Sequence, residues 1–181
     1  NWPEIIQIAW QVYDANFNLI GEKSYYIKPN KKITISDEVQ KLTGINDWKL
    51  ERYGVDIAEA LREFLYDAYP ITIVGHNIEF DLNIIKAEVI RNDIKSIYSY
   101  AYNWNTTEFI EDRLRTFCTM KMTKKLVGIK NQQGYKFPTL SELCQKVLMR
   151  DFNGAHNALN DVKATAACLK ALVENHGFEI D

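Results

Sequence analysis

The sequence has no long apolar run, although 46% of its 181 residues are hydrophobic. A helix that crosses a bilayer needs roughly 20 consecutive apolar residues, and no stretch of this chain approaches that length. A chain of this size can instead bury well over half of the surface that its unfolded form exposes. The sequence therefore predicts one globular domain over residues 1–181, with no membrane partner.

Cysteine is scarce as well. The three cysteines, Cys118, Cys144 and Cys168, lie far apart in the sequence, and none belongs to a Cys-x-x-Cys pair. This spacing argues against a disulfide framework and against a zinc knuckle. We therefore expect a protein of a reducing compartment, the cytoplasm.

Net positive charge is also missing, because 22 Lys and Arg residues stand against 24 Asp and Glu, for a formal net charge of −2. This balance excludes an overall basic body of the kind that coats duplex DNA. The strongest local candidate combines Tyr135 and Phe137 with a set of lysines: Lys121, Lys124, Lys125, Lys130 and Lys136. These side chains could meet a phosphate backbone and stack on bases. The alternative is an ordinary solvated helix face followed by a loop.

Local patterns predict a sheet that opens with a hairpin and is covered by helices. Residues 4–14 and 19–29 are rich in β-branched and aromatic side chains around a turn, and residues 71–75 form an apolar run typical of a buried strand. Helix signals are found at residues 36–44, 57–69, 77–92, 117–127, 139–148 and 159–174. One strand between helices predicts an α/β or α+β fold. Residues 93–116 fit neither pattern and are interpreted as an insertion or lid.

A predicted strand runs directly into a predicted helix at residues 75–81, GHNIEFD. Ligands collect at such sheet edges, and Asp81 would carry a carboxylate on the first helical turn. The alternative is structural, with Asn77 as the helix cap and Asp81 as the partner of the helix dipole. Taken alone, this segment favours the structural interpretation.

A second polar segment, residues 154–161 (GAHNALND), leads into the last predicted helix. His156 falls in the loop and Asp161 on the first or second turn, so an imidazole and a carboxylate can approach one site from different directions. Ala158 permits close packing against a neighbouring strand. In the structural alternative, Asn157 caps the helix, Asp161 complements its dipole and His156 is a surface loop residue. This segment alone leaves both interpretations open.

The chance occurrence of both segments in one chain is much less probable than that of either alone. Each fixes three uncommon residue choices, and either has on the order of a 1% chance of arising in a chain this long. The residues concerned are Asn77, Phe80 and Asp81 in the first segment and His156, Ala158 and Asp161 in the second. They resemble the second and third motifs of the DnaQ-like 3′→5′ exonucleases of the DEDDh kind, the family of bacterial proofreading subunits. The resemblance extends over nearly the whole chain, including residues 42–45, 117–120 and 140–144.

This resemblance implies a ribonuclease H-like α/β fold, with a mixed central sheet flanked by helices, and a definite set of roles. Asp81 and Asp161 would be metal ligands, His156 the general base, and Asn77 and Phe80 substrate-binding residues. Two Mg²⁺ or Mn²⁺ ions about 4 Å apart would stabilise the attacking and leaving oxygens of a phosphodiester displacement. Hard carboxylates suit such ions, and a histidine with a pKa near 6.5 can accept a proton from water at neutral pH.

The substrate implied by the resemblance is the 3′ end of a single-stranded nucleic acid, released as nucleoside 5′-monophosphates. We expect DNA rather than RNA, in proofreading or repair, with a polymerase subunit as the protein partner. Two alternatives stay open. One is an RNA-trimming exonuclease of the same family, and the other is a non-catalytic relative that binds nucleic acid or a polymerase.

One family motif is missing from the sequence. The first motif is Asp-x-Glu on the opening strand, and no such pair occurs before or within residues 4–14. Either that strand precedes this sequence, which makes the exonuclease domain N-terminally incomplete, or the chain is a non-catalytic relative. The start at Asn1 rather than methionine, and the retention of His156 with both aspartates, favour the first explanation. We therefore expect an upstream Asp-x-Glu strand, and no nuclease activity from this chain by itself.

Overall fold

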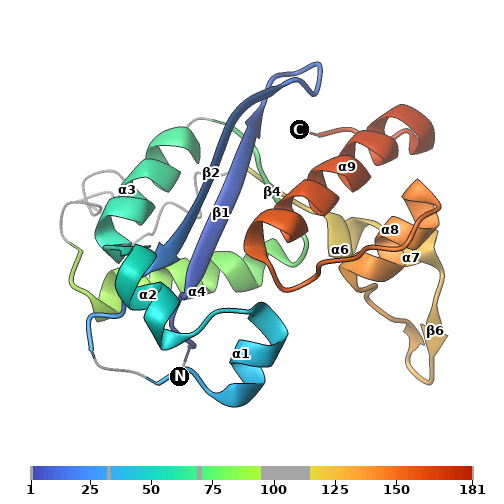
Figure 1. Ribbon diagram of the computed structural model, residues 1–181. Helices are drawn as coiled ribbons and strands as arrows, with labels where there is room; N and C mark the ends of the chain where they lie inside the picture. The colour runs from blue at the N-terminus through green and yellow to red at the C-terminus, as the bar shows by residue number, and fades with distance from the viewer. Residues whose placement is uncertain (1, 32–33, 69–70, 95–114, 181) are drawn as a thin grey trace.

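The computed structural model describes residues 2–31, 34–68, 71–94 and 115–180 (Figure 1). The segment interpreted as an insertion or lid, residues 93–116, falls almost wholly outside the described residues. The predicted hairpin is confirmed, since β1 (Gln7–Tyr13) and β2 (Leu19–Ile27) pair antiparallel. Its turn is held by Asp14, whose carboxylate accepts the backbone N–H groups of Asn16 and Asn18 at 2.9 and 2.8 Å.

A short third strand extends this hairpin into a mixed sheet. The strand β3 (Gly54–Val55) runs parallel to β2, so β2 is the middle strand. Two helices connect them. The predicted α1 (Asp37–Thr43) begins at the Ser36 cap, whereas α2 (Asp47–Tyr53) was not expected from the sequence. A single capping hydrogen bond starts α2, because the Asn46 side chain accepts the N–H of Lys49 at 2.9 Å.

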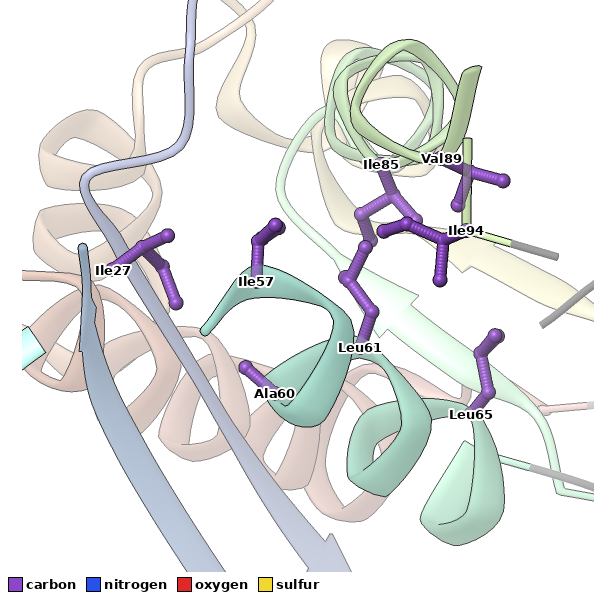
Figure 2. Close-up of a cluster of buried hydrophobic side chains, with 8 residues drawn as sticks. All are labelled: Ile27, Ile57, Ala60, Leu61, Leu65, Ile85, Val89 and Ile94. Carbon is purple, nitrogen blue, oxygen red and sulfur yellow. The ribbon is translucent and has the colours of Figure 1, made fainter. Parts of the chain in front are cut away.

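The main hydrophobic core lies between α3 (Ile57–Ala68), α4 (Ile78–Arg91) and the end of β2. In Figure 2, Leu61 of α3 points toward Ile85 of α4, and Ile27 closes the core from the strand. The buried members are Ile27, Ile57, Ala60, Leu61, Leu65, Ile85, Val89 and Ile94. Each large aliphatic side chain contributes about 1.5 to 3 kcal/mol when it is fully buried. This core therefore fixes α4, the helix that carries Asp81.

A second sheet contains β4 (Ile73–Gly75) and β5 (Thr116–Cys118), which run parallel. The prediction of a continuous helix over residues 117–127 was wrong at its start, because the backbone of Phe117 pairs with Val74. Three residues are too few to show strand periodicity in a sequence. The helical part is split into α6 (Thr119–Met122) and α7 (Lys124–Val127), and a small hairpin of β6 (Lys130–Asn131) and β7 (Gly134–Tyr135) follows.

The chain ends with two helices that pack on each other, α8 (Leu140–Leu148) and α9 (Ala158–His176). Cys144 and Cys168 meet at this contact as free thiols, with their Sγ atoms 3.4 Å apart. The hairpin of β1 and β2 runs through the middle of the molecule, with α3 on one side and α9 on the other (Figure 1). The helix α9 also contacts β4, so it joins the two sheets. No helix in the described ranges is both long and apolar enough to cross a membrane.

Candidate active site

The junction between β4 and α4 places Asp81 on the first turn of a fixed helix. The buried Gly75 makes this junction tight, because a Cβ atom there would lie 2.9 Å from Cδ1 and 3.1 Å from Cβ of Ile78. A side chain at this position would push against the first residue of α4. The glycine therefore lets the helix start directly at the strand end and holds Asp81 at the sheet edge.

Asn77 stands at the cap position of α4, but its side chain makes no capping hydrogen bond. Its backbone has φ 77° and ψ 46°, in the left-handed region. That region costs an ordinary L-residue about 1–2 kcal/mol, and asparagine tolerates it better than most. Asn77 is thus the N-cap residue by position, as the structural interpretation expected, but its side chain does not satisfy a backbone N–H of the helix.

The start of α9 has a similar backbone. His156 has φ 70° and lies exposed in the loop, as the sequence predicted. Here the predicted cap is confirmed, because the Asn157 side chain accepts the N–H of Asn160 at 3.3 Å. The Asn160 amide in turn donates to the carbonyl of Gly154 at 3.1 Å. These bonds fix the loop that presents His156.

Asp161 lies on the first turn of α9 and is directly linked to this loop. Partial burial raises the pKa of Asp161, and a hydrogen bond from the backbone N–H of His156 opposes that rise. The catalytic candidates of the second segment are therefore adjacent in space as well as in sequence.

Asp81 and Asp161 come together from two different helices. The pKa of Asp81 is raised to about 6, first by desolvation and then by the negative charge of Asp161. The Asp81 residue is exposed to solvent, whereas the raised pKa reflects protein atoms crowded around its carboxyl, with desolvation the larger cause. Within the described part of the chain, no group of three or more His, Cys, Asp or Glu residues could hold a metal ion. The site thus contains two mutually repelling carboxylates and His156 beside them.

Phe80 faces outward near the start of α4, unlike its apolar neighbours on that turn. Its side chain is 45% exposed, whereas Ile78 and Leu82 are buried. Its ring packs edge to face against Trp2, with the centroids 5.7 Å apart, and Trp2 is 41% exposed. Two exposed rings next to Asp81 form an apolar surface at the site. The sequence pointed to Phe80, but nothing in it indicated that Trp2 would join it.

A buried carboxylate on α4 holds the start of the chain in this position. Glu88 accepts the N–H of Ile5 at 2.9 Å and pairs with Arg91 at 2.6 Å. Arg91 also donates to the carbonyl of Trp2 at 2.7 Å. Sequence reasoning missed Glu88, because an acidic residue on an amphipathic helix is ordinarily exposed.

His76 is built into the junction as a hydrogen-bonding bridge. Its Nδ1 lies 3.0 Å from Oγ1 of Thr119, and its Nε2 lies 2.9 Å from the carbonyl oxygen of Pro138. Nε2 is the donor to the Pro138 carbonyl, because a carbonyl oxygen only accepts, and burial lowers the pKa of His76. These contacts make His76 a hydrogen-bonding residue at the end of β4.

Another unexpected contact connects β1 with α9. The side chain of Gln7 accepts the backbone N–H of Ala158 at 3.2 Å, so it satisfies a donor at the start of the helix. Ala158 was expected to permit close packing against a strand, and this hydrogen bond shows that approach. Asp161 is therefore positioned by the sheet as well as by its own helix.

The chain is similar over most of its length to known exonucleases. Residues 2–169 match the exonuclease family RNase T. The DNA polymerase III PolC-type of Caldanaerobacter subterraneus subsp. tengcongensis is 26% identical over 171 residues, which cover 94% of this chain and 10% of that protein. The 3′-5′ exonuclease DinG of Bacillus subtilis is 27% identical over 173 residues, 94% of this chain and 16% of that protein. This chain thus spans only a small part of these relatives.

Solved structures give the same fold. Exonuclease I of E. coli in complex with a dT13 oligonucleotide superimposes with a TM-score of 0.72 at 21% identity, over 97% of this chain and 38% of that chain. Exonuclease X in complex with 5′ overhanging duplex DNA superimposes with a TM-score of 0.60 at 18% identity, over 97% of this chain and 86% of that chain. These similarities confirm the predicted ribonuclease H-like α/β fold.

Proposed function

The chain belongs to the RNase T exonuclease family, and we propose that it carries the catalytic half-site of a 3′→5′ exonuclease in Asp81, Asp161 and His156. Its resemblance to the DnaQ-like exonucleases is confirmed by this membership. The observation that carries the proposal is the meeting of Asp81 and Asp161. Carboxylates that repel each other in a partly desolvated site weaken the fold unless a cation neutralises them.

The two carboxylates fit a divalent metal ion. Exonucleases of this family generally use such ions, and the donor set here consists of hard oxygen ligands that suit Mg²⁺ or Mn²⁺. Asp81 and Asp161 would hold the metal. When bound, two such ions stabilise the charge on the attacking and leaving oxygens of a phosphodiester displacement.

The other residues of the site have distinct roles in this proposal. His156, exposed beside Asp161, takes the proton from the attacking water as general base. Asn77, whose amide caps nothing, hydrogen bonds the terminal nucleotide. Phe80 and Trp2 offer the terminal base a partly exposed aromatic surface, and stacking on such rings is tolerant of sequence. The products are nucleoside 5′-monophosphates.

Two carboxylates are too few to hold two hydrated divalent ions, since Mg²⁺ gives up water reluctantly. We place the remaining acidic ligands on a further strand, outside the described residues, between the two sheets. Within the residues that the structure describes, β1 pairs with β2 alone and β4 with β5 alone, and both border α9. An Asp-x-Glu strand there would use both open edges and complete the site. This chain by itself should then be inactive.

We propose single-stranded DNA as the substrate. Exonuclease I, which shares the fold, was solved with a DNA oligonucleotide, and PolC and DinG are among the relatives in sequence. A proofreading or repair role and a polymerase partner are consistent with the PolC relative. The alternatives are an RNA-trimming exonuclease and a protein of the same fold that binds without cutting.

The deciding experiment uses the intact gene product, a 5′-labelled single strand and Mg²⁺. His156→Ala and Asp161→Asn should each lower the rate of nucleotide release by at least about a hundredfold. His176→Ala, at the exposed end of α9, is the matched control and should retain the full rate. Little or no loss in both site variants would refute the enzyme proposal. A faster rate on the matched RNA strand would refute the choice of DNA.

A further inference from the structure

The stretch from Thr116 to Ser141 carries five lysines and no acidic residue, in a chain whose net charge is −2. In the structure it forms α6, α7 and the hairpin of β6 and β7. We call the surface of residues 121–137 the basic track. Figure 1 shows its hairpin, labelled β6, projecting from the rest of the molecule. Local positive charge on an otherwise acidic chain indicates a surface for a polyanion.

The basic track is anchored at both ends on the junction that carries Asp81. The His76 ring bonds Thr119 just before the track and the carbonyl of Pro138 just after it. Lys121 also forms an ion pair with Glu79, which lies on the first turn of α4 with Asp81. The track therefore begins next to the candidate active site and leads away from it.

Three lysines of the track carry charge that no carboxylate neutralises in the described part of the chain. Lys121 and Lys136 have acidic partners, Glu79 and Glu142. In contrast, Lys124 lies over the ring of Phe137 at 4.5 Å, and Lys130 lies over the ring of Tyr135 at 5.2 Å. Lys125 is exposed on α7. A phosphate can recruit these ammonium groups without breaking an ion pair.

The aromatic partners of these lysines are themselves accessible. Phe137 is 48% exposed and Tyr135 is 39% exposed. Rings that alternate with cations match the chemistry of a single strand, since phosphates contact lysine while unpaired bases stack on aromatic side chains. A duplex offers no unstacked base to these rings. An ordinary solvated lysine face would have no exposed aromatic rings on which bases could stack.

We propose that the basic track binds the single-stranded DNA that leads to the active site, with Lys124, Lys125 and Lys130 on phosphates and Tyr135 and Phe137 on bases. This proposal rests on the proposed exonuclease function. It adds a path for the strand beyond the terminal nucleotide, which Phe80 and Asn77 receive. The track should therefore govern the affinity for long strands without affecting the chemical step.

The first test measures binding of a fluorescent dT20 strand to the intact gene product in Ca²⁺ at several salt concentrations. Each lysine-phosphate contact contributes about 0.7 to the slope of log K against log salt on single strands. The variant K124Q/K125Q/K130Q should lower that slope by about two, whereas the control K31Q/K41Q/K170Q, with exposed lysines elsewhere, should not. An unchanged slope in the track variant would overturn the proposal.

The second test removes the rings. Tyr135→Ala with Phe137→Ala should weaken dT20 binding by at least about thirtyfold, because two stacking partners are lost while all the lysines remain. Tyr66→Ala, an exposed aromatic on α3, is the control and should bind as the wild type. Unchanged affinity in the double variant would contradict the assignment of bases to these rings.

A small substrate separates this proposal from the proposed function. The p-nitrophenyl ester of thymidine 5′-monophosphate has a single nucleotide, so it should occupy the active site without engaging Lys124, Lys125 and Lys130. In the presence of Mn²⁺, the triple lysine variant should hydrolyse it at the wild-type rate, while Asp161→Asn should not hydrolyse it. If the wild type cleaves neither this ester nor the labelled single strand, the exonuclease proposal is refuted. The dT20 titration then still decides whether the track binds DNA. Loss of ester hydrolysis in the lysine variant would refute the track as a separate surface.

Discussion

Asp161 lies close enough to Asp81 for its negative charge to raise the pKa of the Asp81 carboxyl. Desolvation is the larger cause, and the two causes together raise that pKa to about 6. The two residues come from the first turns of α9 and α4, in segments that the sequence separates widely. Each segment alone could be explained by helix capping. Their meeting cannot, because capping needs no second acid nearby, and the repulsion lowers the stability of the fold.

The first prediction concerns stability. The pKa of Asp81 is about 6 in the folded chain against an ordinary 3.8, so the folded state favours the protonated form. The cost of ionising Asp81 is therefore absent below about pH 4, grows as the pH rises toward 6, and is complete above it. Asp81→Asn should raise the free energy of unfolding at pH 8 by about 1 kcal/mol, allowing for solvent screening, with no gain at pH 4.

Urea unfolding at both pH values measures this effect. Asp151→Asn, at an exposed loop position, is the control and should not stabilise the protein at pH 8. A gain for Asp81→Asn that is the same at pH 4 and pH 8 would show that the charge of Asp81 is not its cause.

The second prediction separates the backbone of Asn77 from its side chain. Asn77→Gly keeps the positive φ of 77° without steric cost, so stability should change by less than about 0.5 kcal/mol. Asn77→Ala should lose about 1 kcal/mol or more from the left-handed backbone. Both variants of the intact gene product should release nucleotides about tenfold more slowly, because both lack the amide. Full activity in the glycine variant would assign Asn77 to the turn alone.

The third prediction concerns the bridge made by His76. His76→Ala leaves the buried Pro138 carbonyl without this donor, while the Thr119 hydroxyl keeps the Gly75 carbonyl as its partner. The loss should cost about 1–3 kcal/mol of stability at pH 8. Burial lowers the pKa of His76 below its ordinary 6.5, so the folded state favours the neutral ring. Its contribution is present above about pH 6.5 and is lost as the pH falls through the folded pKa.

Thermal unfolding of wild type and variant at pH 8 and pH 5 tests this prediction. The difference in melting temperature should shrink at pH 5. A difference that grows toward acid pH would mean that the charged form of His76 makes the bridge.

Local signals in the sequence were sufficient for much of the fold. The Asp14 turn, the Ser36 cap with Gly44, and the start of α9 at Asn157 each depend on residues within a few positions of one another. The capping residue of α2, Asn46, obeys the same rule. That helix was missed because its seven residues bury only Leu50 and so show little apolar periodicity.

The features that sequence could not give depend on distant parts of the chain. Phe117 lies in a strand rather than a helix because its backbone pairs with Val74. Cys144 and Cys168 are far apart in sequence, yet their thiols meet where α8 packs on α9. Glu88 is buried because the N–H of Ile5 reaches it from the start of the chain.

The residues of the candidate site also fall into those that the sequence indicated and those that only the structure shows. The residue types and their spacing indicated Asp81, Asp161 and His156. Only the folded chain shows the contacts of Trp2 with Phe80 and of Gln7 with Ala158.

Titration calorimetry with Mn²⁺ tests most directly whether Asp81 and Asp161 form a catalytic metal site. The intact gene product should bind two ions, and Asp81→Asn or Asp161→Asn should each abolish or greatly weaken that binding. Residues 1–181 alone should bind Mn²⁺ weakly or not at all, because two carboxylates are too few. Unchanged binding in both variants would contradict the account, as would tight binding of two ions by residues 1–181 alone.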